Sequence, residues 1–205
     1  MTLQSDETRF ILVRHGETDA NRLGYVGGST DDALTERGHE QAGKVATHLG
    51  DTLDMVHALY TSPLKRAQET AGYIGGALDH QPSIIDDLQE WHAGDWEQLE
   101  YSVIPQQPEF RQEALVEADF APPNGESLGS VQKRVVAVLK RLHEQHQGEH
   151  IVVVSHGSAL ALALAELVND DLGAWLNYRL ENCSVTEFIH GPAPRLIEAN
   201  HVEHL

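Results

Sequence analysis

Two histidines, each followed by a glycine, stand one residue after short apolar runs of the sequence. His15 follows residues 10–13, and His156 follows residues 151–154. A neutral imidazole nitrogen can attack phosphorus when the other ring nitrogen donates to a fixed acceptor. A second imidazole can donate a hydrogen bond to the group that is transferred. This pair therefore indicates phosphoryl transfer, with His15 as the nucleophile and His156 as a donor.

Phosphoryl transfer also needs positive charge around the phosphate oxygens and an acid for the leaving oxygen. Arg14 and Arg66 offer planar guanidinium forks that match phosphate oxygens. Because these groups supply the counter-charge, we expect neither a metal nor another cofactor, and the sequence lacks the P-loop and H-E-x-x-H motifs. Glu90 is the candidate acid that protonates the leaving group and later takes a proton from water.

Each signal has an ordinary alternative when it is taken alone. Arg66 would be unremarkable as a surface charge, and Glu90 as a solvated carboxylate. Most of the 13 histidines are expected at the surface, for example His143, His146 and His201. The combination of two His-Gly loops after two apolar runs, with Arg and Glu between them, favours the catalytic interpretation.

The scaffold that must position these residues is predicted from hydrophobic patterns and helix caps. Ser62 is expected to cap one helix, with Pro63 at its first position and the pair Gly75-Gly76 at its end. A long helix is expected from Ser127 to just before Gly148. The other predicted helices are 35–49 and 158–168, and the predicted strands are 10–13, 56–60, 84–88, 151–154, 185–189 and 196–199.

Strands that alternate with helices predict an α/β fold, a three-layer α/β/α sandwich with a mainly parallel central sheet. Ligands bind such sheets beyond the carboxyl ends of the strands, where Arg14, Arg66 and His156 are placed. The length of 205 residues favours one domain, 1–205. A proline-containing stretch at about 97–123 is expected to form a lid-like insertion with a short helix.

The charge and composition exclude several kinds of partner. With 14 basic and 32 acidic residues the formal charge is −18, which disfavours nucleic-acid binding. No apolar run approaches the roughly 20 residues of a membrane span, and the first residues do not resemble a secretory signal. We therefore expect a cytoplasmic protein without nucleic-acid or membrane partners, and a homodimer as one assembly. Cys183, the single cysteine, is expected to be a small buried residue.

The motifs, taken together in their order, resemble those of the histidine phosphatase superfamily, also called the phosphoglycerate mutase-like family. The resemblance spans nearly the whole chain. The motifs that carry it are Arg14-His15-Gly16-Glu17-Thr18 with Asn21, the stretch 24–38, Thr61-Ser62-Pro63-Leu64-Lys65-Arg66-Ala67, the stretch 88–96, Asn124-Gly125-Glu126-Ser127, and Ser155-His156-Gly157.

The resemblance implies a role for each matching residue. His15 would be the phosphorylated nucleophile and Glu90 the proton donor. The implied phosphate pocket consists of Arg14, Arg66 and His156, and the further substrate contacts are Thr18, Asn21, Gly27, Gly28 and Gly157. The chain departs from the family pattern at Ser29, Ala33 and Gln98, where Trp, Pro and Gly are usual.

The resemblance leaves hydrolysis and isomerisation to be distinguished. Mutases of this family resemble the chain but carry more Lys and Arg after the catalytic Glu, whereas residues 97–123 contain only Arg111. This favours a phosphatase that hydrolyses small phosphorylated metabolites. The alternatives are a cofactor-dependent phosphoglycerate mutase, a sugar-bisphosphate phosphatase, a non-catalytic phospholigand-binding module, and a metal hydrolase using His15, Glu17, Asp19 and His156.

Overall fold

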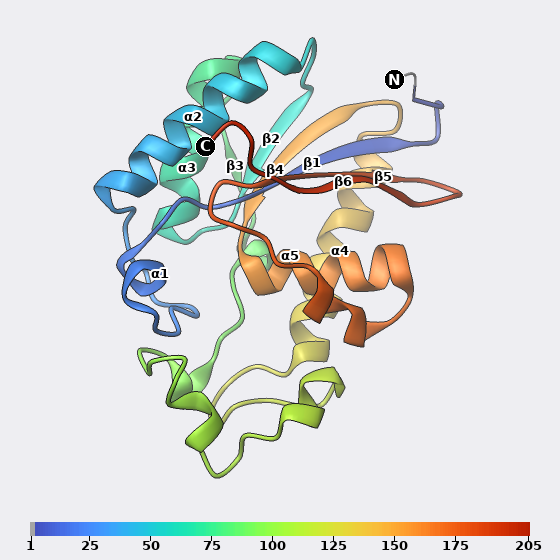
Figure 1. Ribbon diagram of the computed structural model, residues 1–205. Helices are drawn as coiled ribbons and strands as arrows, with labels where there is room; N and C mark the ends of the chain where they lie inside the picture. Colours follow the sequence, from blue (N-terminus) through green and yellow to red (C-terminus); the bar gives the residue numbers. More distant parts are fainter. Residues whose placement is uncertain (1–2) are drawn as a thin grey trace.

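A six-stranded sheet lies at the centre of the computed structural model, which describes residues 3–205 (Figure 1). The strand order is β3-β2-β4-β1-β5-β6. The parallel pairs are β1–β4, β2–β4 and β2–β3, whereas β1–β5 and β5–β6 are antiparallel. The predicted mainly parallel sheet is thereby confirmed. The strands are β1 (Thr8–Arg14), β2 (Ala58–Thr61), β3 (Ser83–Ile84), β4 (His150–Ser155), β5 (Val185–His190) and β6 (Arg195–His201).

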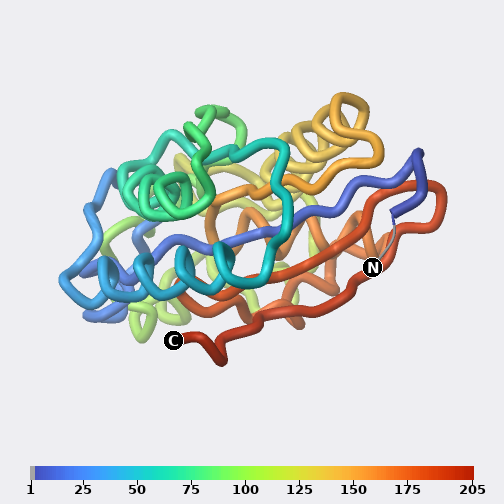
Figure 2. The backbone as a smooth tube through the Cα atoms, turned by 90° about the horizontal axis from the view of Figure 1, so that it is seen from above, coloured from blue at the N-terminus to red at the C-terminus, as the bar shows by residue number. Residues whose placement is uncertain are grey.

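Helices cover both faces of this sheet, as the predicted sandwich requires (Figures 1 and 2). Side chains alternate between the two faces of a strand. Ile11 and Val13 of β1 accordingly pack with helices α2 (Glu36–Thr52) and α3 (Lys65–Leu78). Phe10 and Leu12 pack on the other face with α4 (Leu128–Gln145) and α5 (Gly157–Leu164). A short helix, α1 (Asp19–Leu23), follows β1.

Two helices begin where the sequence predicts, each after a side-chain cap. The hydroxyl of Thr35 accepts a hydrogen bond from the Gly38 N–H at the start of α2. The hydroxyl of Ser127 accepts one from the Ser130 N–H at the start of α4. Each side chain satisfies one of the backbone donors that a helix leaves free at its first turn.

The predicted boundaries of α3 are wrong at both ends. The helix begins at Lys65 rather than at Pro63, because the Ser62 hydroxyl lies 2.7 Å from Nε2 of His156 and the backbone there is still extending from β2. The helix also continues through Gly75 and Gly76 to Leu78. A Cβ on Gly75 would lie 2.4 Å from the carbonyl oxygen of His80, so this glycine permits a close backbone contact and does not end the helix.

Two further elements are shorter than predicted. The expected strand at 84–88 is a strand only at Ser83–Ile84, and it is followed by a 3₁₀ helix at Asp86–Leu88 that buries Leu88. The expected helix at 158–168 is α-helical over Gly157–Leu164 and continues as a π-helix at Ala165–Asn169. The short strand at 83–84 has a tertiary cause: the Leu88 side chain is buried, and its carbonyl oxygen accepts a hydrogen bond from the Ser155 hydroxyl.

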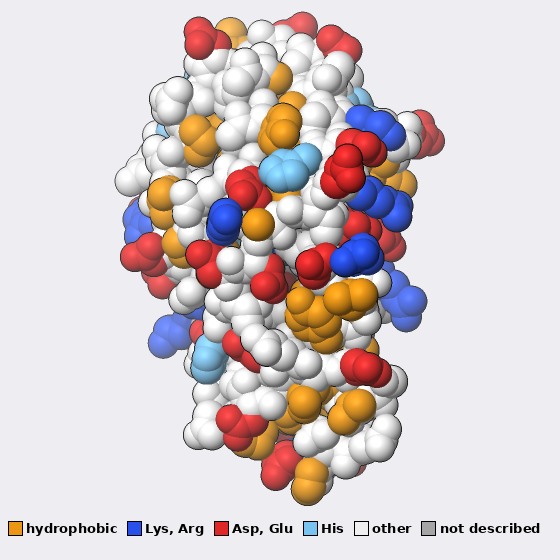
Figure 3. Space-filling view, turned by 90° about the vertical axis from the view of Figure 1, so that its left-hand side faces the viewer, with side chains coloured by type: hydrophobic (Ala, Val, Ile, Leu, Met, Phe, Trp, Pro, Cys, Tyr) orange, Lys and Arg blue, Asp and Glu red, His pale blue; other side chains and the backbone are white. Residues whose placement is uncertain are grey.

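Residues 97–123 form the lower lobe in Figure 1 and contain two short 3₁₀ helices, Ile104–Gln106 and Gln112–Val116. Figure 3 shows a narrower waist between this lobe and the body of the molecule, where apolar side chains gather, while acidic side chains are spread over the face in view. Gln98 has a φ of 66°, a left-handed conformation that favours glycine. The backbone therefore explains why glycine is usual at this position in the family. No helix among residues 3–205 is long and apolar enough to cross a bilayer.

The histidines expected at the surface are half-buried instead. The Thr8 hydroxyl lies 2.9 Å from Nδ1 of His143, and the Tyr60 hydroxyl lies 2.7 Å from Nε2 of His146. Both rings therefore contribute hydrogen bonds to the packing of α4 against the sheet. Cys183 is buried as predicted, and burial raises the pKa of its thiol to about 12.

Candidate active site

The two His-Gly loops lie side by side because β1 and β4 are neighbours in the sheet. Arg14 is the register partner of Ser155, and the N–H of His15 donates to the Ser155 carbonyl oxygen over 3.0 Å. The rings of His15 and His156 lie 5.1 Å apart between centroids. Two imidazoles that are distant along the chain thus meet at the carboxyl ends of two parallel strands, where the sequence predicted them.

The hydrogen bonds of His15 define its tautomer. Nδ1 donates to the Gly16 carbonyl oxygen over 2.7 Å, which leaves the lone pair on Nε2. The Nε–H of Arg66 points at that lone pair over 3.2 Å. Burial, followed by the charges of Arg66 and Arg14, lowers the pKa of His15 well below its usual value. The ring is therefore a neutral base with Nε2 as the nucleophilic atom.

The backbone fixes both guanidinium groups. Arg66 donates from Nη1 to the Thr30 carbonyl oxygen (2.6 Å) and from Nη2 to the Gly28 carbonyl oxygen (2.7 Å). Arg14 donates from Nη1 to the Leu180 carbonyl oxygen (2.6 Å), and its buried Nε has no partner among the described residues. Carbonyl oxygens orient a guanidinium without neutralising it, so both positive charges remain available to an anion.

His156 is held by Ser62. The Ser62 hydroxyl lies 2.7 Å from Nε2, and Nδ1 is buried without a partner among residues 3–205. When the hydroxyl donates to Nε2, the ring carries its proton on Nδ1 and can donate it to an anion. Burial lowers the pKa of His156 well below its usual value, and the charge of Arg66 lowers it further.

Glu90 is held at the N-terminus of α5. Its Oε1 accepts from the N–H groups of Trp91 (2.8 Å) and Ala159 (3.0 Å), and its Oε2 accepts from the N–H of Ser158 (3.1 Å). These donors fix the carboxyl group beside the same cavity that His15 lines. The helix thereby connects the position of Glu90 to the loop that carries His156.

Most of the predicted site residues line a small cavity of about 50 Å³. Gly157 and His156 are not on its wall: Gly157 packs behind Arg14, where an added Cβ would lie 3.5 Å from Nε of Arg14. The other predicted site residues all line the cavity, namely Arg14, His15, Thr18, Asn21, Gly27, Gly28, Arg66 and Glu90.

A larger cavity of about 440 Å³ lies next to the small one and shares Gly27, Gly28, Glu90 and Tyr101 with it. No Lys or Arg of the described residues lines it. Its remaining wall is mostly apolar and aromatic and includes Val26, Trp91, Trp96, Ile104, Phe110, Leu115 and Trp175. The site therefore combines a small positively charged end with a large apolar end.

Several supporting residues were not predicted as part of the site. The amide Nδ2 of Asn182 donates to the carbonyl oxygen of His15 over 3.0 Å, and Leu180 supplies the acceptor for Arg14. Tyr101 lines both cavities. Ser62 belongs to the motif at 61–67, but the sequence predicts its side chain as a helix cap and not as a partner of His156. For Leu180, Asn182 and Tyr101 no local sequence pattern indicated a role.

Comparison with known proteins agrees with this geometry. Residues 10–199 match the model of the histidine phosphatase superfamily (branch 1). The adenosylcobalamin/alpha-ribazole phosphatase of Escherichia coli is 34% identical over 176 residues, which cover 84% of this chain and 85% of that protein. A crystal structure of a phosphoserine phosphatase from Entamoeba histolytica, in complex with phosphoserine, superposes with a TM-score of 0.85 at 31% identity and covers 97% of this chain and 99% of that one.

Some relatives are longer proteins. The chain matches a bifunctional protein of Mycobacterium tuberculosis at 32% identity over 186 residues, 88% of this chain but 50% of that protein. The similarity is thus to a unit that also occurs within larger proteins. With a family match over residues 10–199, the chain belongs to the histidine phosphatase superfamily.

Proposed function

We propose that the chain hydrolyses phosphate monoesters of small metabolites through a phosphohistidine formed on His15. The observation that carries this proposal is the neutral His15 ring, with the lone pair of Nε2 facing Arg66 on the wall of a cavity of about 50 Å³. Buried positive charge beside a neutral nucleophile suits attack on a phosphate group.

In the first step, the Nε2 lone pair of His15 forms a bond to phosphorus while the bond between phosphorus and the ester oxygen breaks. The leaving alkoxide takes a proton from the Glu90 carboxyl group. Arg14 and Arg66, which line the cavity, stabilise the charge on the other phosphate oxygens. His156 lies behind the cavity wall, with its ring 5.1 Å from that of His15 between centroids, and is proposed to donate its Nδ1 proton to the same phosphate group. No metal is assigned a part in this step, because the guanidinium groups provide the positive charge.

In the second step, water attacks the phosphohistidine and the bond between phosphorus and nitrogen breaks. Glu90, now a carboxylate, takes the proton from the water, and His15 returns to its neutral form. Thr18, Asn21 and the backbone at Gly27 and Gly28 are proposed to contact the substrate, since all of them line the cavity. Gly157 is proposed to act through Arg14, against which it packs.

Hydrolysis is favoured over phosphoglycerate isomerisation by the charges around the larger cavity. A mutase must hold the second charged end of a bisphosphate, yet no Lys or Arg of the described residues lines this cavity. Arg111, the one basic residue of 97–123, is paired with Glu117 over 3.1 Å at the surface. Phosphate release measured beside isomerisation tests this choice, and isomerisation of phosphoglycerate with negligible phosphate release would contradict it.

The substrate is proposed to carry an apolar or aromatic organic group that occupies the larger cavity. We expect Phe110→Ala to lower kcat/KM for an aryl phosphate such as naphthyl phosphate by about tenfold, since a lost aromatic contact costs on the order of 1–2 kcal/mol. The value for phosphoserine should change much less. Val116→Ala is the matched control, because Val116 lies in the same lobe, is exposed and does not line the cavity. Equal losses for both substrates would argue against this specificity.

The charge of Arg66 is expected to control the pH dependence of the enzyme. Arg66→Gln removes a positive neighbour of His15, so the pKa of His15 rises. Because only neutral His15 can attack, the acid limb of the kcat/KM profile should move to higher pH, and kcat should fall by about 10² to 10³. Arg22→Gln, an exposed change in α1, is the control. An acid limb that stays in place in Arg66→Gln would contradict the assignment.

The cytoplasmic location, the absence of nucleic-acid partners and the homodimer remain predictions from the sequence. Sedimentation of the purified chain would test the last of these.

A further inference from the structure

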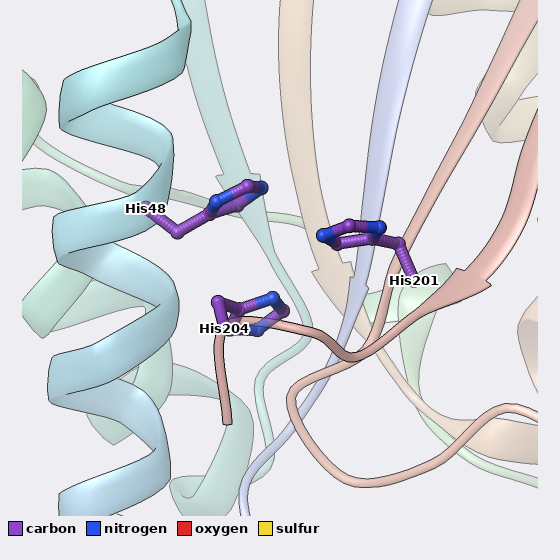
Figure 4. Close-up of side chains that lie close together, drawn as sticks. All are labelled: His48, His201 and His204. Carbon is purple, nitrogen blue, oxygen red and sulfur yellow. The ribbon is translucent and has the colours of Figure 1, made fainter.

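Three histidines outside the catalytic cavities form a cluster at one edge of the sheet (Figure 4). His48 lies on α2, His201 ends β6, and His204 lies in the turn that follows. A nitrogen of each ring lies within 4.8 Å of a nitrogen of the others. Figures 1 and 2 both place the C-terminal segment beside α2, which explains how residues so distant in the sequence meet. The prediction of His201 as a surface residue is therefore wrong, since its ring is half-buried in this cluster.

Hydrogen bonds fix the tautomers of two of these rings. Nδ1 of His201 donates to Glu198 Oε1 over 3.0 Å, which leaves the lone pair on Nε2. Nε2 of His204 donates to the Cys183 carbonyl oxygen over 3.0 Å, which leaves the lone pair on Nδ1. That Nδ1 atom is buried and has no partner among the described residues. In metal sites, a carboxylate or carbonyl acceptor on the far ring nitrogen orients a histidine ligand in this way.

The free nitrogens border one common space. Figure 4 shows a nitrogen of each ring turned toward the gap between the three side chains. Ring centroids lie 4.7 Å (His48 to His204), 5.1 Å (His48 to His201) and 5.6 Å (His201 to His204) apart. Nitrogen ligands of a tetrahedral zinc ion lie about 3.4 Å from one another, given bonds of about 2.1 Å. The planes of the His48 and His204 rings are only 14° apart, so these side chains must rotate for the three in-plane lone pairs to meet at one ion.

We propose that His48, His201 and His204 bind one zinc ion. Three imidazole nitrogens favour zinc and similar transition metals over calcium or magnesium, which prefer oxygen ligands. The fourth position would face the groove lined by Glu40, Lys44 and Asp51 of α2, where water can complete the coordination.

The charges around the cluster favour a cation. Among the described residues, Glu40 and Asp51 of α2 and Glu198 of β6 lie at the cluster, and Lys44 of α2 lines the same groove. Glu187 of β5 is also near the cluster, but it is paired with Arg9 over 2.6 Å.

The proposed ion would stabilise the fold and take no part in the chemistry, because none of its three ligands lines either catalytic cavity. It would join α2 to the segment after β6. Through His204 it would also hold Cys183, whose N–H bonds to the carbonyl oxygens of Arg14 (3.0 Å) and His15 (3.2 Å). The ion would thus support the backbone behind the catalytic loop.

The test is calorimetric titration of the chelator-stripped chain with zinc chloride at pH 7.5, together with thermal unfolding. We expect one ion bound per chain and a rise in Tm with zinc concentration. In His48→Gln the affinity should fall at least tenfold and the rise in Tm should disappear. The imidazole of His48 makes no hydrogen bond to the other described residues, and its backbone carbonyl, which accepts from the Thr52 hydroxyl, is kept in the variant, so this variant is expected to fold normally. His57→Gln is the matched control, because His57 and His150 form another histidine pair, with ring centroids 6.1 Å apart.

A second variant tests the orientation of the ligands. Glu198→Gln, at an exposed residue, should weaken zinc binding by about 10- to 100-fold without changing the Tm of the metal-free chain. With cobalt in place of zinc, the wild type should show the strong visible absorption of four-coordinate cobalt, and His48→Gln should not. Equal zinc affinity in the wild type and His48→Gln, or binding lost only in His57→Gln, would overturn the proposal. Phosphatase activity is measured separately, so failure of either proposal leaves the other testable.

Discussion

His15→Ala is expected to lower kcat for phosphate monoesters by about 10⁴-fold or more, since it removes the atom that forms the covalent intermediate. Rapid quenching of the wild type under basic conditions should trap a chain that is heavier by one phosphoryl group. The peptide that contains His15 should carry the added mass. The variant should show neither turnover nor the added mass.

The control for this experiment must separate loss of the nucleophile from loss of folding. His92→Ala changes an exposed histidine near the site and should keep full activity. His15→Ala should still bind inorganic phosphate, because Arg14 and Arg66 are held by backbone carbonyl oxygens and not by His15 alone. Substantial turnover by a folded His15→Ala chain would exclude the proposed intermediate.

Glu90→Gln is expected to show an effect that depends on the leaving group. For an alkyl phosphate, whose alkoxide needs a proton, kcat should fall by about 10² to 10⁴. For p-nitrophenyl phosphate, whose phenolate leaves without a proton, formation of the phosphohistidine should slow much less. The glutamine amide oxygen can still accept from the N–H groups of Trp91 and Ala159, whereas the N–H of Ser158 loses its acceptor, so the Tm of the variant is measured beside its activity.

Burst kinetics distinguish the two steps in this variant. With p-nitrophenyl phosphate, Glu90→Gln should release one equivalent of nitrophenol quickly and then turn over slowly, because water attack still lacks its base. Glu97→Gln is a suitable control, since Glu97 accepts hydrogen bonds from Ser29 and Ala93 but does not line either cavity. Equal losses for both leaving groups would argue against Glu90 as the acid.

The sequence predicted the central part of the site because its residues directly follow strands. His15 and His156 are each next to a strongly apolar run, and parallel pairing of β1 with β4 places such residues together. The glycine after His15 is also explained by the structure, because the backbone at Gly38 packs against it: a Cβ on Gly16 would lie 2.6 Å from the carbonyl oxygen of Gly38. Glu90 was located by its motif, although its hydrogen bonds to α5 were not predicted.

Features that depend on long-range packing were missed or misread. The Ser62 hydroxyl accepts from the Leu64 N–H over 3.3 Å and also bonds to Nε2 of His156 over 2.7 Å, and only the pairing of β2 with β4 brings the second partner near. The contacts of Leu180 and Asn182 arise from the antiparallel pairing of β5 with β1, which no local pattern encodes. For the same reason the cluster of His48, His201 and His204 has no recognisable spacing in the sequence.

The hydrogen bond from Arg14 to Leu180, two residues 166 positions apart, also constrains the order of events during synthesis. A ribosome that has made only the first half of the chain carries the nucleophile and both arginines without the backbone that orients Arg14. Such a nascent chain cannot yet hold phosphate as the finished protein does. Activity should therefore begin only after residues 180–190 have left the ribosomal tunnel and β5 has joined the sheet.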